Sequence, residues 1–115
     1  MAVRLFTKNA SALLGAIKTA IDEGHIDTWA YDDVGDFTHT THERQWERRA
    51  WLRPSIRNGR LLLNIIFATG EKQQREVYGV YHGRFIEMAI IHVSKFFDPG
   101  AATANMTKED KELNS

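Results

Sequence analysis

The feature that most constrains the fold of this chain is the Asn58-Gly59 pair, which lies between two stretches of alternating apolar residues. Asn-Gly is a preferred sequence for the type I′ turn of a β-hairpin, because both central residues of that turn need a positive φ. A two-residue turn here places Arg57 opposite Arg60 and fixes the register of both strands. One face is then apolar throughout and is predicted to be core: Ala50, Leu52, Pro54, Ile56, Leu61, Leu63, Ile65 and Phe67.

The opposite face of the predicted hairpin mixes arginines with apolar residues. Tryptophan and arginine are enriched at the energetic hot spots of protein interfaces. Arginines interleaved with an aromatic ring also suit base stacking and phosphate contacts with a single-stranded nucleic acid. We therefore predict a binding face, and the alternative without function is a solvated strand with one half-exposed tryptophan. The predicted binding residues are Arg49, Trp51, Arg53, Arg57, Leu62, Asn64 and Ile66.

The composition limits the classes of function. With 115 residues the chain is long enough for one domain that needs no disulfide or metal to stabilise it. It has no cysteine, which excludes thiol catalysis and cysteine-ligated zinc and fits a reducing compartment. The formal net charge is zero, which argues against a nucleic-acid coat protein and makes nucleic acid the less favoured partner of the arginine-bearing face.

The charges are nevertheless distributed unevenly. The segment from Asp22 to Asp36 has six acidic residues and no lysine or arginine, whereas the segment from His42 to Arg60 has six arginines and two glutamates. Patches of opposite sign on one chain can pair between two copies, so this segregation hints at self-association. We expect a protein partner, either a second copy or a different protein.

No membrane segment or signal peptide is predicted. No apolar run approaches the roughly 18 residues that a transmembrane helix needs. Lys18 and Asp22 interrupt the first apolar segment, and no clear small-residue cleavage site follows it. We therefore expect a cytoplasmic protein without a membrane partner, and nothing in the sequence calls for a cofactor.

A helix is predicted in the first quarter of the chain. Residues Met1–Phe6 are too short a segment to assign. From a cap residue, Thr7 or Asn9, apolar residues recur at helical spacing. Gly24 ends the helix as a left-handed C-terminal cap.

A short hairpin is predicted next, with strands Ile26–Tyr31 and Asp36–Thr40. The intervening Asp32-Asp33-Val34-Gly35 is typical of a type I turn that closes through a glycine bulge. This register pairs Tyr31 with Phe37 and gives the hairpin an aromatic face, which we expect to be core.

After the central hairpin, residues Gln74–Tyr81 are rich in valine and tyrosine and are predicted to form a fifth strand. The competing interpretation is that the final helix already begins near Glu76. Gly79 and Gly83 would each cost such a helix about 1 kcal/mol relative to alanine, which favours the strand. The final helix then runs from about residue 84 to residue 97.

Together these elements predict an α+β fold, in which a five-stranded, mostly antiparallel meander sheet lies between an N-terminal and a C-terminal helix in the order α-β-β-β-β-β-α. Residues 1–98 form a single two-layer domain. Asp98-Pro99-Gly100 ends the last helix, and residues 99–115 are small and polar, so a disordered tail is predicted. If both helices cover the same face of the sheet, the face with the arginines stays open.

Two histidines and an aspartate are weak candidates for a metal site. Asp36, His39 and His42 are spaced by three residues and carry side chains that suit zinc, nickel or iron. Residues three apart on a strand point to opposite faces, so the histidines converge only if the chain turns between them. Thr40 to Glu43 has the spacing of a capping box and predicts a helical turn over His42–Glu47. The favoured alternative places His39 at the core edge and His42 on the surface.

His82, Arg84 and Glu87 lie where the predicted fifth strand meets the final helix. Backbone N–H groups at a helix start bind anions, with Arg84 assisting and His82 acting as acid or base. The alternative is a tight connection in which Arg84 pairs with Glu87. No nucleophile–base pair and no phosphate-binding glycine loop supports catalysis, so no catalytic residue is assigned.

The leading functional hypothesis is a small non-enzymatic protein-interaction module that self-associates through the outer face of the sheet. The first alternative is binding of single-stranded nucleic acid on the same face. The second is a metal-dependent or anion-binding site that uses His39, His42 or the pair His82 and Arg84.

Overall fold

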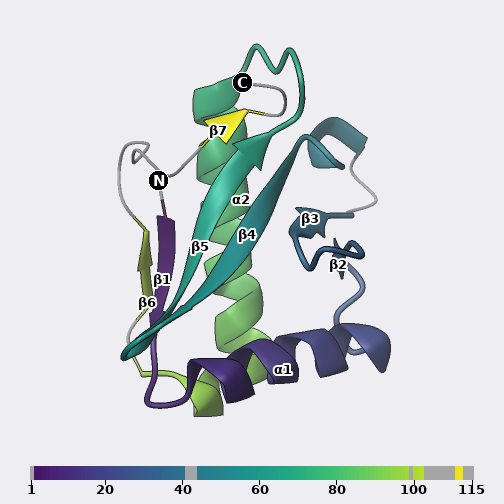
Figure 1. Ribbon diagram of the computed structural model, residues 1–115. Helices are drawn as coiled ribbons and strands as arrows, with labels where there is room; N and C mark the ends of the chain where they lie inside the picture. Colours follow the sequence, from purple (N-terminus) through teal and green to yellow (C-terminus); the bar gives the residue numbers. More distant parts are fainter. Residues whose placement is uncertain (1, 41–43, 99, 103–110, 113–115) are drawn as a thin grey trace.

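The computed structural model describes residues 2–40, 44–98, 100–102 and 111–112 and shows one open sheet with two helices (Figure 1). The elements are β1 (Ala2–Phe6), α1 (Ala10–Asp22), β2 (Trp29–Tyr31), β3 (Phe37–His39), the 3₁₀ turn η1 (Arg44–Trp46), β4 (Ala50–Arg57), β5 (Arg60–Phe67), α2 (Gln74–Val93), the 3₁₀ turn η2 (Ser94–Phe96), β6 (Gly100–Ala102) and β7 (Lys111–Glu112). The α+β class predicted from the sequence is confirmed.

The sheet has the strand order β2-β3-β4-β5-β1-β6, and these neighbours are all antiparallel. The central hairpin has the predicted register from Arg57 opposite Arg60 to Ala50 opposite Phe67. Its turn is not of type I′, because φ is positive at Gly59 (80°) and not at Asn58. The two-residue turn still gives the predicted register, because Gly59 supplies the positive φ at its second position.

The N-terminal elements also follow the prediction. Asn9 is the N-cap of α1 and accepts a hydrogen bond at Oδ1 from the Ala12 backbone N–H (3.0 Å). Gly24 follows the helix with a φ of 80°. In the β2–β3 hairpin Tyr31 pairs with Phe37, as predicted.

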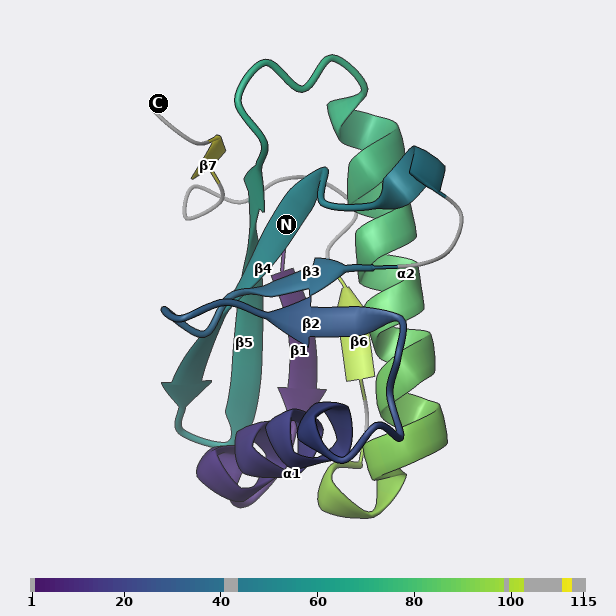
Figure 2. The same ribbon diagram turned by 90° about the vertical axis from the view of Figure 1, so that its right-hand side faces the viewer.

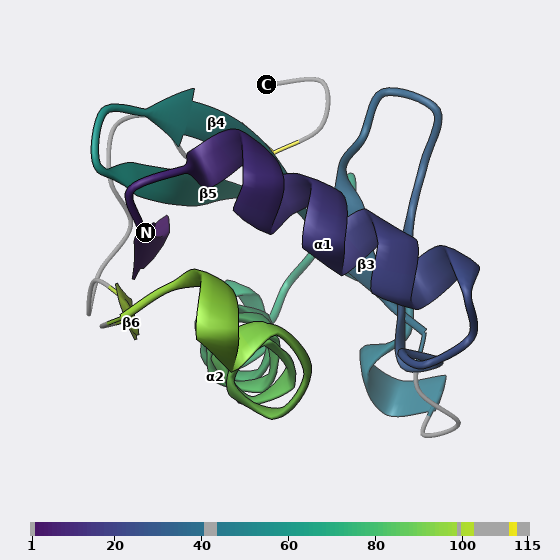
Figure 3. The same ribbon diagram turned by 90° about the horizontal axis from the view of Figure 1, so that it is seen from below.

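Both helices pack on the same face of the sheet. α2 crosses behind β4, β5 and β1, and α1 lies crosswise to α2 on the same side (Figures 1 and 3). The side chains of Leu13 and Ile17 from α1 are fully buried in one core with Tyr81 and Phe85 from α2. Of the hairpin residues predicted to be core, Pro54 is half-buried and Ile56 is 55% exposed, because both lie towards the tip of the hairpin.

The predicted fifth strand at Gln74–Tyr81 is wrong, and the competing helix interpretation is right. α2 is continuous from Gln74 to Val93. Val77, Tyr81 and Phe85 recur at helical spacing and are all fully buried, so the burial of this stripe outweighs the low helix propensity of the two glycines on the exposed side.

The remaining strand comes from the N-terminal segment that the sequence left unassigned. β1 lies between β5 and β6, with Val3 and Leu5 fully buried. The order of the main elements is therefore β-α-β-β-β-β-α. Within residues 99–115, which were predicted to be disordered, β6 and β7 are short strands of the sheet.

The connection between β3 and β4 is described only in part. The capping box predicted at Thr40 and Glu43 involves residues 41–43, which lie outside the described residues. η1 falls within the helical turn predicted for His42–Glu47. In the described part of the chain, neither helix has the length and apolar character that crossing a bilayer requires.

Candidate functional site

Within the part of the chain that the structure describes, no helix lies on the outer face of the β4–β5 hairpin (Figure 2). Of its predicted binding residues, Arg53 and Arg57 are exposed and Trp51 is half-buried. By contrast Leu62, Asn64 and Ile66 are only 7%, 7% and 3% exposed. The part of this face that a partner can reach therefore consists of Trp51, Arg53 and Arg57, which we call the docking face.

Arg53 is held in place by Asp36, which lies directly before β3. Its Nε and Nη2 atoms donate to the two carboxylate oxygens of Asp36 at 3.1 and 2.8 Å. The side chain of Asp36 is 6% exposed, whereas that of Arg53 is 46% exposed. The hydrogen bonds that Arg53 donates to Asp36 raise the pKa of Arg53. Asp36 thus acts as the partner of an arginine, and the guanidinium presents its other edge to solvent.

Arg49 flanks the docking face and is held by Glu71 from the segment before α2. Its Nε and Nη2 atoms donate to the carboxylate of Glu71 at 2.8 and 2.7 Å. Nη1 also donates to the Gln45 carbonyl at 2.9 Å, and the guanidinium lies 5.4 Å from the centre of the Trp46 ring. The hydrogen bond from Arg49 lowers the pKa of Glu71. No sequence pattern predicts either carboxylate partner, because Asp36 and Glu71 are 17 and 22 residues away from their arginines.

Tyr81 fixes the start of β4 to α2. Its hydroxyl donates to the Trp46 carbonyl (2.5 Å) and accepts from the Arg49 backbone N–H (2.9 Å). The side chain is fully buried, and burial raises its pKa. The position of Arg49 and of the docking face beyond it is therefore determined by the core.

His39 is 2% exposed and lies beside Trp29, with 4.8 Å between the ring centres. Its Nδ1 is 2.7 Å from the Thr28 carbonyl, and its Nε2 is 3.2 Å from Nη1 of Arg84. A guanidinium only donates, so Nε2 accepts and Nδ1 carries the proton. His42 lies outside the described residues. Among the residues that the structure describes, no three His, Asp or Glu side chains gather as metal ligands.

His82, Arg84 and Glu87 lie in the middle of α2 and not at the start of a helix. His82 is 2% exposed, its Nδ1 is 2.6 Å from the Tyr78 carbonyl, and its ring stacks on that of Tyr78 at 4.0 Å. Arg84 points towards His39 instead, and Glu87 is exposed. The structure therefore does not bring these three side chains together, and the backbone N–H groups beside them lie inside the helix.

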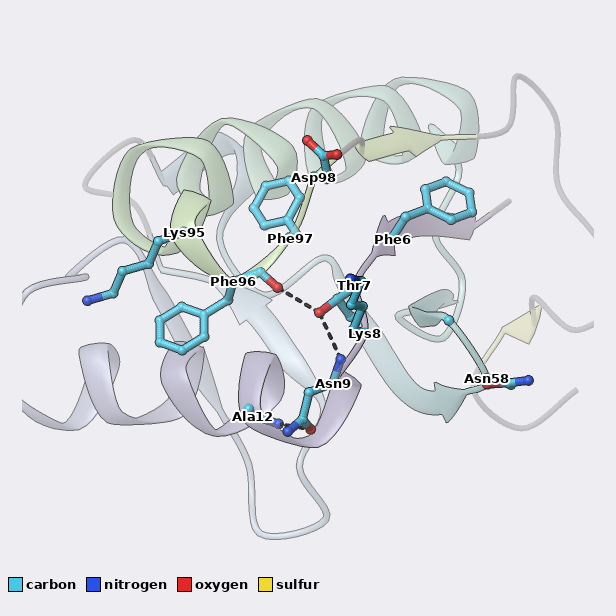
Figure 4. Close-up of a pocket in the computed structure, with 11 residues that line it drawn as sticks. Phe6, Thr7, Lys8, Asn9, Ala12, Asn58, Lys95, Phe96, Phe97 and Asp98 are labelled. Carbon is cyan, nitrogen blue, oxygen red and sulfur yellow. Dashed lines mark hydrogen bonds between the residues drawn. The ribbon is translucent and has the colours of Figure 1, made fainter.

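A shallow groove of about 920 Å³ lies between the start of α1, the β4–β5 turn and the segment after α2 (Figure 4). The Thr7 hydroxyl donates to the Phe96 carbonyl at 2.6 Å and accepts from the Asn9 N–H at 3.1 Å, which joins the two walls. No sequence pattern predicts this groove, because its walls come from separate segments. It is lined by Phe6, Thr7, Lys8, Asn9, Ala12, Asn58, Gly59, Lys95, Phe96, Phe97 and Asp98.

Comparisons with protein-family models, with curated proteins and with solved structures give no match to this chain.

Proposed function

We propose that the protein is a non-enzymatic interaction module that self-associates through the docking face. The observation that carries the proposal is the position of Trp51. Its ring is half-buried on a sheet face without a helix, and the residues two positions before and after it are arginines held by carboxylates. Tryptophan and arginine in this arrangement are typical of the centre of a protein interface.

The two carboxylates prepare Arg49 and Arg53 for binding. A free arginine loses rotamer entropy when a partner immobilises it, and this loss weakens the complex. Glu71 and Asp36 each fix a guanidinium through two hydrogen bonds before any partner arrives. The rigid surface around Trp51 therefore favours a specific protein partner.

A second copy is the partner that the charges favour. The β2–β3 turn presents exposed Asp32 and Asp33, and Asp32 is close enough to Arg53 to contribute to the raised pKa of that arginine. A surface with neighbouring positive and negative patches is self-complementary about a two-fold axis, because each patch meets its opposite twice. The exposed Arg57 extends the positive patch along β4.

Single-stranded nucleic acid is the weaker candidate for this face. Arg49 and Arg53 already have carboxylate partners, so a phosphate would compete with Glu71 and Asp36 for them. The net charge of zero gives no long-range attraction to a polyanion.

Light scattering over a concentration series tests the proposal. For the wild type we expect the mass to rise towards twice that of the monomer, and for Trp51→Ala we expect association about 30-fold weaker, as for the loss of a hot-spot residue. Ile91→Ala is the matched control, because Ile91 is an exposed apolar residue (66%) on α2. Salt should weaken the wild-type complex.

Two results would contradict the proposal: a wild type that stays monomeric up to about 1 mM, where even weak complexes form, or equal association of Trp51→Ala and wild type. Titration with a labelled single-stranded oligonucleotide at low salt separates the alternative. Binding that falls with salt and with Arg57→Ala would favour nucleic acid.

A further inference from the structure

The two edges of β5 are covered in different ways. β4 pairs with β5 along its whole length, from Arg60 to Phe67. On the other edge the pairing with β1 extends only from Arg60 to Asn64. Beyond it, Ile66 and Phe67 pair with β7, at Lys111 and Glu112 (Figure 1).

The pairing with β7 differs from the rest of the sheet. It is parallel, whereas the other pairings between described strands are antiparallel, and β7 has only two residues. β7 lies beside the end of β5 and away from α2 (Figure 2). The edge that it covers belongs to one of the most buried parts of the chain, since Ile66 is 3% and Phe67 0% exposed.

An unpaired strand edge is a template for another strand, so an edge of this kind is normally covered or blocked. A two-residue strand covers it with few main-chain hydrogen bonds, and such a pairing opens readily. The connection from Ala102 to Lys111 spans at most about 30 Å when extended, so β7 reaches the same edge of any neighbouring copy that lies within this distance.

We propose that the edge of β5 at Ile66 and Phe67 is a strand-addition site and that β7 is an exchangeable occupant of it. In a single chain the edge is closed by the chain's own Lys111–Glu112. In a pair of chains the same segment of the second copy takes its place and makes identical contacts, which is strand exchange of the domain-swapping kind. The site uses the backbone edge of β5 and does not depend on the side chains of the docking face.

A peptide with the sequence of residues 103–115, labelled with a fluorophore, tests the site on the full-length protein. In a Lys111→Pro chain residue 111 has no N–H and a fixed φ, which disfavours its pairing with Ile66 and frees the edge, whereas Lys111→Ala keeps it covered. We expect the peptide to bind the Lys111→Pro chain at least tenfold more tightly than the Lys111→Ala chain. If β7 leaves the edge of the Lys111→Ala chain open for about a tenth of the time, the apparent affinity of that chain is lowered about tenfold.

Equal binding to both chains, or binding to neither, would overturn the proposal. The same peptide with the Lys111→Pro change should bind neither chain. Thermal unfolding checks that both variants are folded. We expect similar melting temperatures for the two, because the two residues of β7 contribute little to the sheet.

Cysteine cross-linking detects the exchange between whole chains. The protein has no cysteine, so each disulfide that forms must join the introduced cysteines. Ile66 and Lys111 are Cα partners, so a mixture of Ile66→Cys and Lys111→Cys chains should form a disulfide-linked dimer under mild oxidation. Lys95→Cys, exposed on η2, replaces Lys111→Cys in the control mixture.

Equal yields of dimer in the two mixtures would refute the exchange. Adding Trp51→Ala to both partners separates this inference from the proposed function. If the cross-link persists while Trp51→Ala has no effect on association in light scattering, the strand exchange stands and the docking face fails.

Discussion

The hydroxyl of Tyr81 provides the most direct test of how the docking face is anchored. It donates to the carbonyl of Trp46 and accepts from the backbone N–H of Arg49, and so joins α2 to the start of β4. Tyr81→Phe removes this single atom and keeps the buried ring, which also lies edge-on to Trp29 at 5.6 Å. The change therefore isolates the two hydrogen bonds from the packing.

The expected loss of stability follows from the two backbone groups that lose their partner, the carbonyl of Trp46 and the N–H of Arg49. Leaving a buried backbone donor or acceptor unsatisfied costs about 1–3 kcal/mol. Trp46 is half-buried, so water reaches its carbonyl more easily than the N–H of Arg49 and reduces that part of the cost. We therefore expect Tyr81→Phe to lower the free energy of unfolding by about 2–3 kcal/mol, and the melting temperature by about 10 °C.

Urea unfolding followed by circular dichroism measures this difference. The matched control is Tyr31→Phe, because the hydroxyl of Tyr31 also bonds a partner, the carboxylate of Asp22, but on the exposed surface. We expect a much smaller loss for the control and an unchanged slope with urea for both variants. If Tyr81→Phe is no less stable than Tyr31→Phe, the anchoring of β4 by α2 is wrong.

Three further predictions concern charge and glycine. The pKa of Glu71 is lowered in the folded protein, so its ion pair with Arg49 stabilises the fold at pH values above the pKa of a glutamate in the unfolded chain, about 4.3. This stability is lost as the pH falls through the pKa of the folded protein. In urea titrations at a series of pH values, Glu71→Gln should therefore reduce the loss of stability at acidic pH. Gly83→Ala should raise the free energy of unfolding by about 0.5–1 kcal/mol, because an added Cβ meets open space in the middle of α2; calorimetry that shows a loss would indicate a contact there. Gly59→Ala should lower it by about 1–2 kcal/mol in the same assay, because Gly59 has a φ of 80°.

Much of the sheet was predictable because its signals are local. The Asn58-Gly59 turn and the alternation on either side of it determine the register of β4 and β5, since a slip by one residue would turn the apolar face outward. The N-cap and the terminal glycine bound α1 in the same way. Each of these signals lies within a few residues of the structure that it specifies.

The helix α2 shows where local signals fail. Valine, tyrosine and two glycines favour a strand at Gln74–Tyr81 when the segment is considered alone. In the folded chain, a helix here buries Val77 and Tyr81 against the other core residues, and this burial exceeds the propensity cost. The position of β1 in the sheet was likewise undetermined, because a five-residue apolar segment has no period of its own.

The sequence by itself determined that Trp51 shares a face with Arg53 and Arg57, because side chains alternate along any strand. Only the tertiary structure decided that both helices cover the opposite face, that Leu62 and Ile66 are buried, and that Asp36 and Glu71 hold Arg53 and Arg49. These outcomes depend on contacts between residues that are distant in the chain, and no pattern within one segment encodes such a contact.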